Sequence, residues 1–403
     1  MALVVQKYGG TSVGSLDRIR AVADRVAAGR ANGDQMVVVV SAMSGETDRL
    51  LGLGRQLAER PNEREMDSLA ATGEQVSAAL LSIALGERGI PSQSLVGHQA
   101  RILTDGVFTK ARIRAIDVEP LRVALADGAV PVIAGFQGLD AHGNITTLGR
   151  GGTDTTAVAI AAALHADVCE IYTDVEGVFT TDPNVCPDAR KIEKITFDEM
   201  LELASLGAKV LQLRSVEVGK KYGMPIAVRT SFSDRPGTLV AEGQDFEAVV
   251  VAAVACDKNE VKLTVPGLPD KPGIVARIFE ALAAANISVD IITQSAALKG
   301  ATDVTFTVPR SDMRKAREVT TEVSRAIGAG DVHVDDQVAK VSIVGAGMRS
   351  HPGVAAKMFR ILADQGINIH AIATSEIRVS CVIESKQADA AVRALHDGFD
   401  LAS

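Results

Sequence analysis

The sequence contains no tryptophan, and aromatic residues make up only 3% of its 403 residues. So few aromatic side chains argue against the stacking platforms that bind single-stranded nucleic acid. The formal net charge is −8 and no long basic run occurs, so nucleic acid is not an expected partner. No apolar stretch is long enough to predict a membrane span, and the first residues lack the charged leader and cleavage site of a signal peptide.

Cysteine is also scarce, and the four cysteines lie far apart, at Cys169, Cys186, Cys256 and Cys381. The absence of a CxxC pair or a mixed cysteine and histidine cluster predicts neither a zinc site nor a disulfide framework. We therefore expect a cytoplasmic protein. A chain of 403 residues, 47% of them hydrophobic, is too long for one core and predicts two or three globular domains.

The first 230 residues alternate between short apolar runs and helical periodicity. Strands are predicted at 3–6, 36–40, 129–134, 168–172 and 226–229. Helices are predicted from Leu16 after a Ser15 cap, at 72–85, at 157–164 and across 197–222. This alternation is typical of an α/β domain with a mostly parallel sheet, whose ligands bind beyond the carboxyl ends of the strands.

The central feature is the glycine-rich stretch Leu148–Thr156, which leads into the helix predicted at 157–164. Its glycines allow close backbone approach, and the helix N-terminus favours an anion. Arg150 adds a planar fork suited to a carboxylate or phosphate. We expect Thr153 or Asp154 to cap the helix. The alternative is an ordinary capped helix start without a ligand.

Further positions carry candidate charges, each with a structural alternative. Lys7, followed by Gly9 and Gly10, is typical of a phosphate site, although it matches no P-loop pattern and an ordinary turn is the alternative. Glu74 lies near a predicted helix start, where it would also complement the helix dipole. Three others have simple alternatives as turn or surface residues: Asp174, Asp182 and Lys209.

The C-terminal part contains an internal repeat at an offset of 80 residues. Residues 271–282 align with 351–362, and each copy has the pattern strand, Pro-Gly loop, helix, strand, strand, helix. The second strands are predicted at 287–292 and 367–372. The first copy ends with a strand near Val332–Val334, and the second lacks a counterpart. We predict that the strand Ala248–Ala255, ahead of the first copy, completes the sheet of the second.

Four segments resemble the aspartate kinases of the amino acid kinase superfamily: Lys7–Ser12, Val39–Gly45, Arg150–Asp154 and Tyr172–Pro183. The repeats resemble ACT regulatory modules. The resemblance implies an α/β amino acid kinase fold, a mostly parallel sheet sandwiched by helices, over residues 1–245. It implies two α+β ferredoxin-like ACT domains, one at 262–337 inserted into another made of 246–261 and 338–403.

The resemblance also implies roles for individual residues. Lys7 and Asp154 would be catalytic. Aspartate would be bound by Ser41, Thr47, Glu74, Arg150, Gly151, Gly152 and Thr153. ATP would be bound by Lys7, Tyr8, Gly9, Gly10, Tyr172, Thr173, Asp174, Phe179, Asp182, Pro183 and Lys209. An effector would be bound by Asp270, Gly273, Ile274, Val275, Asp290, Gln294, His351, Gly353, Val354, Asn368, Ile369, Ser375 and Glu376.

The implied reaction is transfer of a phosphoryl group from ATP, with Mg²⁺, to the β-carboxylate of L-aspartate. No protein side chain is expected to bind the metal directly. Lysine and threonine are the implied effectors, and the ACT modules imply a homo-oligomer, with or without a separate regulatory subunit. Two alternatives stay open: an amino acid sensor with a degenerate kinase domain, and another carboxylate or carbamate kinase of the superfamily, such as a glutamate kinase.

Overall fold

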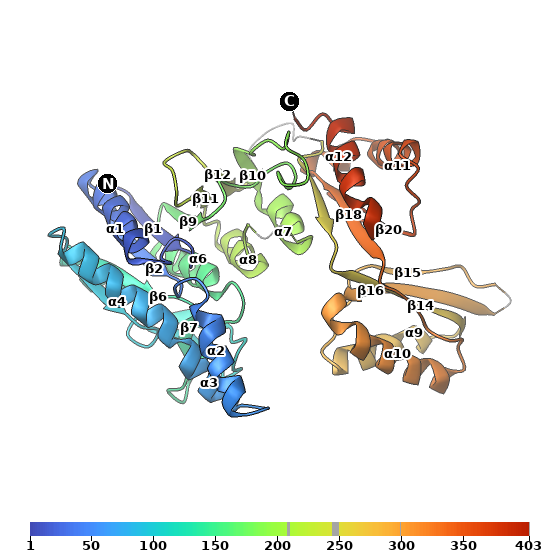
Figure 1. The fold of residues 1–403 in the computed structure, drawn as a ribbon, viewed down its shortest axis with the longest axis horizontal. Coiled ribbons are helices and arrows are strands. Elements are labelled where there is room, and N and C mark those ends of the chain that lie inside the picture. Colours follow the sequence, from blue (N-terminus) through green and yellow to red (C-terminus); the bar gives the residue numbers. More distant parts are fainter. Residues whose placement is uncertain (208–209, 244–249, 299, 403) are drawn as a thin grey trace. The chain divides into compact units, whose positions relative to one another are not determined.

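The computed structural model describes residues 1–207, 210–243, 250–298 and 300–402. The chain divides into two compact units (Figure 1). The first contains Met1–Val178, Lys191–Ala204 and the elements between 210 and 243. The second contains Phe179–Arg190, residues 205–207 and the described residues from 250 onward. A segment from the middle of the chain thus folds with the C-terminal repeats.

The first unit is built on an eight-stranded sheet of order β10-β12-β11-β9-β1-β2-β6-β3. Its strands are β1 (Leu3–Tyr8), β2 (Gln35–Val40), β3 (Ser92–Leu95), β6 (Val130–Ala134), β9 (Val168–Thr173), β10 (Lys194–Thr196), β11 (Ile226–Thr230) and β12 (Thr238–Ala241). Among the described strands of this sheet, only the β11–β12 pair is antiparallel. The predicted mostly parallel α/β sheet is confirmed.

Helices cover both faces of this sheet because its strands are apolar on both sides. On one face, α1 (Leu16–Ala31) and α4 (Thr72–Gly86) share a core with alternate residues of β1, β2 and β6. On the other, α6 (Gly152–Leu164) contacts β1, β2 and β9, and it packs against α8 (Leu213–Tyr222). Ser15 caps α1 as predicted, accepting a hydrogen bond from the Arg18 amide.

A smaller sheet of order β5-β4-β7-β8 was not predicted from the sequence. It contains β4 (Ile102–Thr104), β5 (Ile113–Ile116), β7 (Gln137–Leu139) and β8 (Ile145–Thr147). Beside it lies α3 (Glu63–Ala70), which packs against α2 (Glu46–Leu57), and α5 (Glu119–Ala126) precedes β6. These strands are three or four residues long, too short for periodicity to reveal.

One helical stretch of the described residues, Glu63–Gly86, has the length and hydropathy of a membrane span, although no span was predicted from the sequence. It consists of α3 and α4, and it carries the buried carboxylates of Asp67 and Glu74. Because the apolar face of α4 packs on the sheet, these helices form part of the domain core.

One local prediction for the first unit is refined and another was wrong. The helical region predicted across 197–222 contains two helices, α7 (Phe197–Ser205) and α8; Gly207, which follows α7, has a φ of +90°, which ends a right-handed helix. Neither Thr153 nor Asp154 caps α6. The cap position belongs to Gly151, whose φ is +70°, and both predicted caps lie within the first turn.

The second unit contains two four-stranded antiparallel sheets. The first repeat forms β15-β16-β14-β17, from β14 (Glu260–Pro269), β15 (Ile292–Gln294), β16 (Ala301–Pro309) and β17 (His333–Asp335), with α9 (Ile274–Ala284) and α10 (Met313–Ile327). The other sheet is β13-β18-β20-β19, from β13 (Ala253–Asp257), β18 (Val338–Val344), β19 (Ala371–Thr374) and β20 (Arg378–Glu384), with α11 (Val354–Asp364) and α12 (Ala388–Gly398).

The strand ahead of the first repeat does join the sheet of the second, since β13 pairs with β18. It begins at Ala253 rather than Ala248, and residues 248–249 lie outside the described part of the chain. The strands predicted at 287–292 and 367–372 begin later, at Ile292 and Ala371. In the first repeat, Asn286 with a φ of +56° turns the chain, and regular pairing starts only beyond that turn.

Candidate active site

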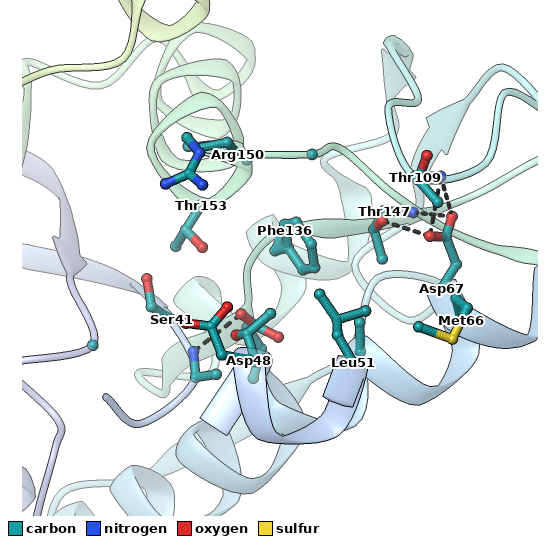
Figure 2. Close-up of a pocket in the computed structure, with 18 of the residues that line it drawn as sticks. Ser41, Asp48, Leu51, Met66, Asp67, Thr109, Phe136, Thr147, Arg150 and Thr153 are labelled. Carbon is teal, nitrogen blue, oxygen red and sulfur yellow. Dashed lines mark hydrogen bonds between the residues drawn. The ribbon is translucent and has the colours of Figure 1, made fainter. Parts of the chain in front are cut away.

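A cavity of about 710 Å³ lies in the first unit, where β1 and β2 end and α6 begins (Figure 2). This is the location expected for a ligand site in a parallel sheet, because the loops that follow the strands meet at the carboxyl edge. Ten of the residues predicted from the sequence line it: Lys7, Gly10, Ser41, Thr47, Glu74, Arg150, Gly151, Gly152, Thr153 and Asp154.

The catalytic candidates form an ion pair on the cavity wall. The Lys7 Nζ atom lies 2.6 Å from Asp154 Oδ1, and each side chain is 11% exposed. Lys7 comes near the end of β1, and Asp154 lies in the first turn of α6, where the helix dipole favours a carboxylate. The pair therefore holds a cation at the rim of a site that can admit an anionic ligand.

The glycines of this wall are required by close contacts. A Cβ atom on Gly151, which already has a left-handed φ, would lie 1.9 Å from Gln212 Cγ. On Gly10, a Cβ atom would lie 2.9 Å from the Ala42 carbonyl oxygen. A larger residue would therefore displace the Gln212 side chain at Gly151 or the backbone of Ala42 at Gly10.

Glu74 places a second acidic group in the cavity. Its side chain is 3% exposed; Oε1 accepts a hydrogen bond of 3.1 Å from the Ala42 amide, and Oε2 has no partner among the described residues. Burial raises the pKa of Glu74 to about 7, and the Ala42 bond offsets only part of this effect. A ligand ammonium group would satisfy the unpaired oxygen and favour the ionised form.

Arg150 supplies a cation on the same cavity wall. It follows Gly149, is exposed, and has no ion-pair partner among the residues that the structure describes. The cavity thus contains a free guanidinium group and an unsatisfied carboxylate, together with the hydroxyl groups of Ser41, Thr47 and Thr153. These groups are complementary to an amino acid, which carries both charges.

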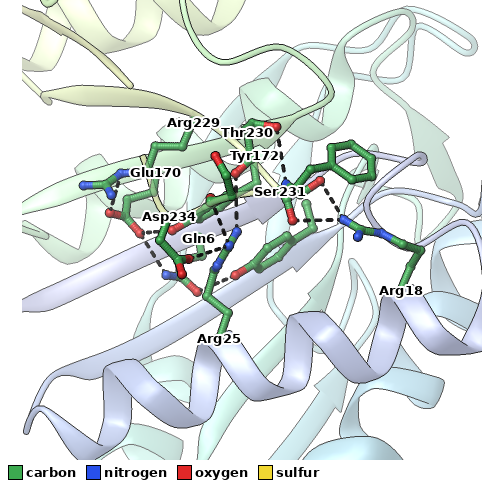
Figure 3. Close-up of polar contacts among 12 residues, drawn as sticks. Gln6, Arg18, Arg25, Glu170, Tyr172, Arg229, Thr230, Ser231 and Asp234 are labelled. Atoms are coloured by element: carbon green, nitrogen blue, oxygen red, sulfur yellow. Dashed lines mark hydrogen bonds and ion pairs between the residues drawn. The ribbon is translucent and has the colours of Figure 1, made fainter. Parts of the chain in front are cut away.

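The two tyrosines predicted to bind ATP have their rings elsewhere. Successive strand residues point to opposite faces, so Tyr8 faces away from Lys7. The Tyr8 ring is fully buried, stacked at 4.8 Å on the Tyr172 ring, and its hydroxyl donates to Gln6. These rings belong to a polar cluster that includes Arg25 of α1 (Figure 3). Any contact of Tyr8 or Tyr172 with a nucleotide in the cavity would therefore involve the backbone.

The remaining ATP candidates are less closely grouped. The Gly9 amide donates to the Tyr172 carbonyl oxygen at 3.2 Å, and the Thr173 hydroxyl donates to the exposed Asp174. Phe179, Asp182 and Pro183 fold with the second unit, where Asp182 accepts hydrogen bonds from Asn184. Lys209 lies outside the described residues.

The effector candidates lie in the second unit, mostly in exposed loops. Gly273 and Gly353, both with positive φ, precede the first turns of α9 and α11, which contain Ile274, Val275 and Val354. Asp270, Gln294 and Asn368 are exposed, Ile369 is half-buried, and Ser375 follows β19. Several candidates already have polar partners: Asp290 binds Lys340, His351 contacts the Gly347 carbonyl oxygen, and Glu376 pairs with Arg349.

One buried acidic residue in the cavity wall, Asp67, was not predicted from the sequence. Asp67 of α3 is 1% exposed and accepts hydrogen bonds from Thr109 and Thr147. These partners lie 42 and 80 residues away in the chain, so no local pattern connects them. Only the fold reveals that Asp67 contacts the loop leading to Arg150.

Family models match most of the chain. Residues 2–230 match the amino acid kinase family, and residues 262–322 and 341–399 match an ACT domain. An aspartate kinase of Pseudomonas putida is 55% identical over 403 residues, covering 100% of this chain and 98% of the relative. The similarity therefore includes both the kinase unit and the repeats.

Solved structures give the same result. The chain matches E. coli aspartokinase III in complex with aspartate and ADP at 29% identity, with a TM-score of 0.81 and coverage of 98% and 99% of the two chains. The same E. coli enzyme in complex with lysine and aspartate matches at 28% identity and a TM-score of 0.78, again covering 98% and 99%. Together with the cavity described above, these similarities establish that the chain belongs to the amino acid kinase family, as one of the aspartate kinases that carry ACT domains.

Proposed function

We propose that the cavity holds L-aspartate against the phosphates of ATP and that the substrate β-carboxylate attacks the γ-phosphorus directly. The new O–P bond gives 4-phospho-L-aspartate, and the bond to the leaving oxygen breaks to release ADP. The observation that supports this most strongly is the Lys7–Asp154 ion pair in a wall that also contains Arg150 and the unpaired oxygen of Glu74.

This nucleophile needs no general base. A carboxyl group with a pKa of about 3.9 is already ionised at neutral pH. The barrier instead arises from bringing two anions together and aligning them, so the enzyme must neutralise charge and fix position. Lys7 would neutralise charge on the transferred phosphoryl group, and Asp154 would hold the lysine in place. This division of work uses only groups that the cavity contains.

The substrate-binding roles follow from charge. Arg150 would bind a carboxylate of aspartate as a planar fork, and Glu74 would bind the ammonium group. Ser41, Thr47 and Thr153, which line the cavity, would contribute hydroxyl groups. The amides around Gly151 and Gly152 at the start of α6 would favour the negative charge of the substrate.

We propose that Mg²⁺ enters with ATP, bound to phosphate oxygens rather than to a dedicated protein site. Asp154 is engaged with Lys7, whereas Asp174, after β9, is exposed and would face the water shell of the ion. The ion would add positive charge at the phosphates when bound. Thr173, Asp174 and the segment with Phe179, Asp182 and Pro183 remain proposed nucleotide contacts, as does Lys209.

The test is to incubate the purified protein with ATP, MgCl₂ and hydroxylamine, which traps acyl phosphates as hydroxamates. We expect aspartate hydroxamate and stoichiometric ADP with L-aspartate, and less than about one hundredth of that rate with L-glutamate, since one extra methylene displaces the nucleophile. ADP release without hydroxamate, or a preference for glutamate, would contradict the proposal.

Regulation by lysine and threonine is part of the proposal. The helix starts after Gly273 and Gly353 and the exposed candidates around them would bind an effector. Residues 262–337 would form one ACT domain and residues 246–261 with 338–403 the other. Inhibition of the hydroxamate assay by lysine, threonine or their mixture would support this; unchanged activity with all three would exclude it.

We also propose that the enzyme forms a cytoplasmic homo-oligomer through its ACT domains. The edge strands β15 and β19 expose Ile292 and Ile372, which a second copy would cover. All four cysteines are free, as expected in a reducing compartment. Sedimentation of the full chain with and without effector would measure the assembly, and a monomer under both conditions would contradict it.

A further inference from the structure

Asp67 is a buried carboxylate that the reaction as proposed does not use. Its side chain accepts hydrogen bonds from two segments beyond its own helix (Figure 2). The Thr109 amide lies 3.0 and 2.9 Å from its two oxygens. The amide and hydroxyl of Thr147 each lie 2.7 Å from an oxygen. Such charge-assisted bonds are stronger than neutral ones.

Thr147 is the last residue of β8 and lies three positions before Arg150. The next residue, Leu148, is fixed from the other side, because its carbonyl oxygen accepts a hydrogen bond of 2.6 Å from Arg214. Arg214 also donates to the Ala111 carbonyl oxygen at 3.0 Å. The backbone entering the glycine-rich loop is therefore held by Asp67 at Thr147 and by Arg214 at Leu148.

The second segment bound by Asp67 supports the same loop. A Cβ atom on Gly149 would lie 3.0 Å from the Thr109 carbonyl oxygen, so residues 109 and 149 pass each other at backbone distance. The amide of Thr109 is bound to Asp67. One carboxylate thus fixes both β8 and the segment that packs against Gly149.

We propose that Asp67 is a positioning residue for substrate binding: it orients the loop that carries Arg150, so that the guanidinium group meets a carboxylate of aspartate. The inference rests on the proposed role of Arg150. Arg150 is exposed and has no ion pair within the described ranges, so its own side chain does not hold the loop in place.

Asp140 provides a matched control. It is also buried, at 5% exposure, and it accepts hydrogen bonds from the amides of His142 and Asn144 and from the Asn144 side chain. It lies in the turn between β7 and β8, in the same small sheet, and is not among the residues lining the cavity. Loss of either carboxylate removes a comparable hydrogen-bond network, but only Asp67 holds the Arg150 loop.

The experiment compares Asp67→Asn with Asp140→Asn by steady-state kinetics and thermal unfolding. In Asp67→Asn, the negative charge that strengthens these bonds is lost, and the amide nitrogen replaces one of the two oxygens that accept from the Thr109 N–H group, so the loop is held less firmly. We expect the KM for aspartate to rise at least about tenfold in Asp67→Asn, with the KM for ATP changed less than about twofold. Asp140→Asn should lower the Tm while leaving both KM values within about twofold of wild type.

A parallel rise of both KM values in Asp67→Asn, or no rise in either, would overturn the inference. If Asp67→Asn does not fold, Thr147→Val removes only the hydroxyl bond, and we expect a KM for aspartate about threefold higher. An unchanged value in that variant would equally overturn the inference. A wild-type protein that forms no aspartate hydroxamate would instead refute the proposed function, before any variant is compared.

Discussion

Two buried lysines, one in each unit, differ in what surrounds them. Lys7 pairs with one carboxylate, Asp154, at 2.6 Å, and lines a cavity of about 710 Å³. Lys340 of β18 is 3% exposed and binds two carboxylates, Glu260 at 2.9 Å and Asp290. Burial alone would lower the pKa of Lys340, but the two carboxylates more than offset this and raise it.

The comparison shows that a buried lysine paired with a carboxylate can serve either stability or substrate binding, depending on its surroundings. Lys340 belongs to the second repeat and its partners to the first, and the apolar contacts of Ile291 with Val338 and Val382 lie in the same unit. Its charge is already satisfied by the protein, so its expected role is to join the two sheets. Lys7 has one partner and open space beside it, so it can contact a substrate.

Replacing Lys7 tests this distinction with the largest expected effect. We expect Lys7→Ala to lower kcat at least about a thousandfold, a loss of about 4 kcal/mol of transition-state stabilisation, because the charge that offsets the phosphoryl group is gone. The far-UV spectrum and Tm should change little, since the cavity lets water reach Asp154. Fixed-time hydroxamate assays measure kcat, and circular dichroism with thermal scans measures the fold and the Tm.

The matched control for Lys7 is Lys220→Ala, which removes an exposed pair with Asp198 in the same unit. It should leave kcat unchanged, because exposed pairs stabilise a protein by at most about 1 kcal/mol and do not approach the substrate. Near-normal turnover in Lys7→Ala would refute the catalytic role of Lys7.

Replacing Lys340 should show the opposite behaviour. Lys340→Met leaves Glu260 buried without its cation, and we expect a loss of about 3 kcal/mol in the free energy of unfolding of the second unit. Changing Glu260→Met in the same chain should restore most of it, since an apolar pair of similar size is tolerated. Denaturant unfolding followed by circular dichroism gives these values.

Here the control is Lys258→Met, which breaks an exposed pair with Asp389 in the same unit and should cost less than about 1 kcal/mol. At temperatures well below unfolding, kcat of Lys340→Met without effector should stay within about twofold of wild type, because Lys340 does not line the cavity. A large drop in kcat of Lys340→Met with an unchanged unfolding midpoint would contradict the structural role of Lys340.

The functional role of Lys7 was predicted from the sequence, whereas the buried ion pairs of Lys340 were not. Lys7 lies at the end of an apolar run before two glycines, and the fold brings it to the helix start at Asp154 because parallel strands end at one edge. Glu260 and Lys340 are 80 residues apart, which is also the repeat offset. Opposite charges at equivalent positions of two adjacent copies are the signal in the repeat alignment that could have indicated this pair.

Other failures have local causes. Strand alternation places the Tyr8 ring on the face opposite Lys7, whereas the family motif assigns both residues to one ligand. Asp67 could not be found, because Thr109 and Thr147 reach it only through the small sheet, whose strands carry no clear periodicity. Patterns along the chain predict which elements form, whereas contacts between distant loops depend on how those elements pack.

The smallest expected effect concerns Glu74. Its buried carboxyl group lines the cavity, as Lys7 does, but it has no ion-pair partner among the described residues, whereas Lys340 has two. Because its pKa of about 7 in the folded protein exceeds the ordinary value of 4.5, the folded state holds the proton more tightly. The contribution of Glu74 to stability is therefore highest below pH 4.5, falls as pH rises toward 7, and is constant above. The full shift corresponds to about 3 kcal/mol.

We therefore expect Glu74→Gln to raise the free energy of unfolding by about 2 kcal/mol at about pH 8. The gain is smaller than the full shift because the buried amide is itself desolvated, and we expect no gain at about pH 4.5. The same variant should raise the KM for aspartate about tenfold at about pH 8, since a neutral amide binds an ammonium group more weakly than a carboxylate. In the wild type this KM should rise as pH falls below 7, and Glu74→Gln should remove that dependence.

The control is Glu199→Gln: Glu199 is buried but accepts hydrogen bonds from Thr196, so its loss should lower stability at about pH 8 and leave the KM unchanged. Both glutamates are buried, but of the two only Glu74 has an oxygen without a partner among the described residues. Comparing them therefore distinguishes the effect of burial from the effect of a missing hydrogen-bond partner. A Glu74→Gln protein less stable than wild type at that pH would show that this carboxylate, like those around Lys340, is already compensated by the protein.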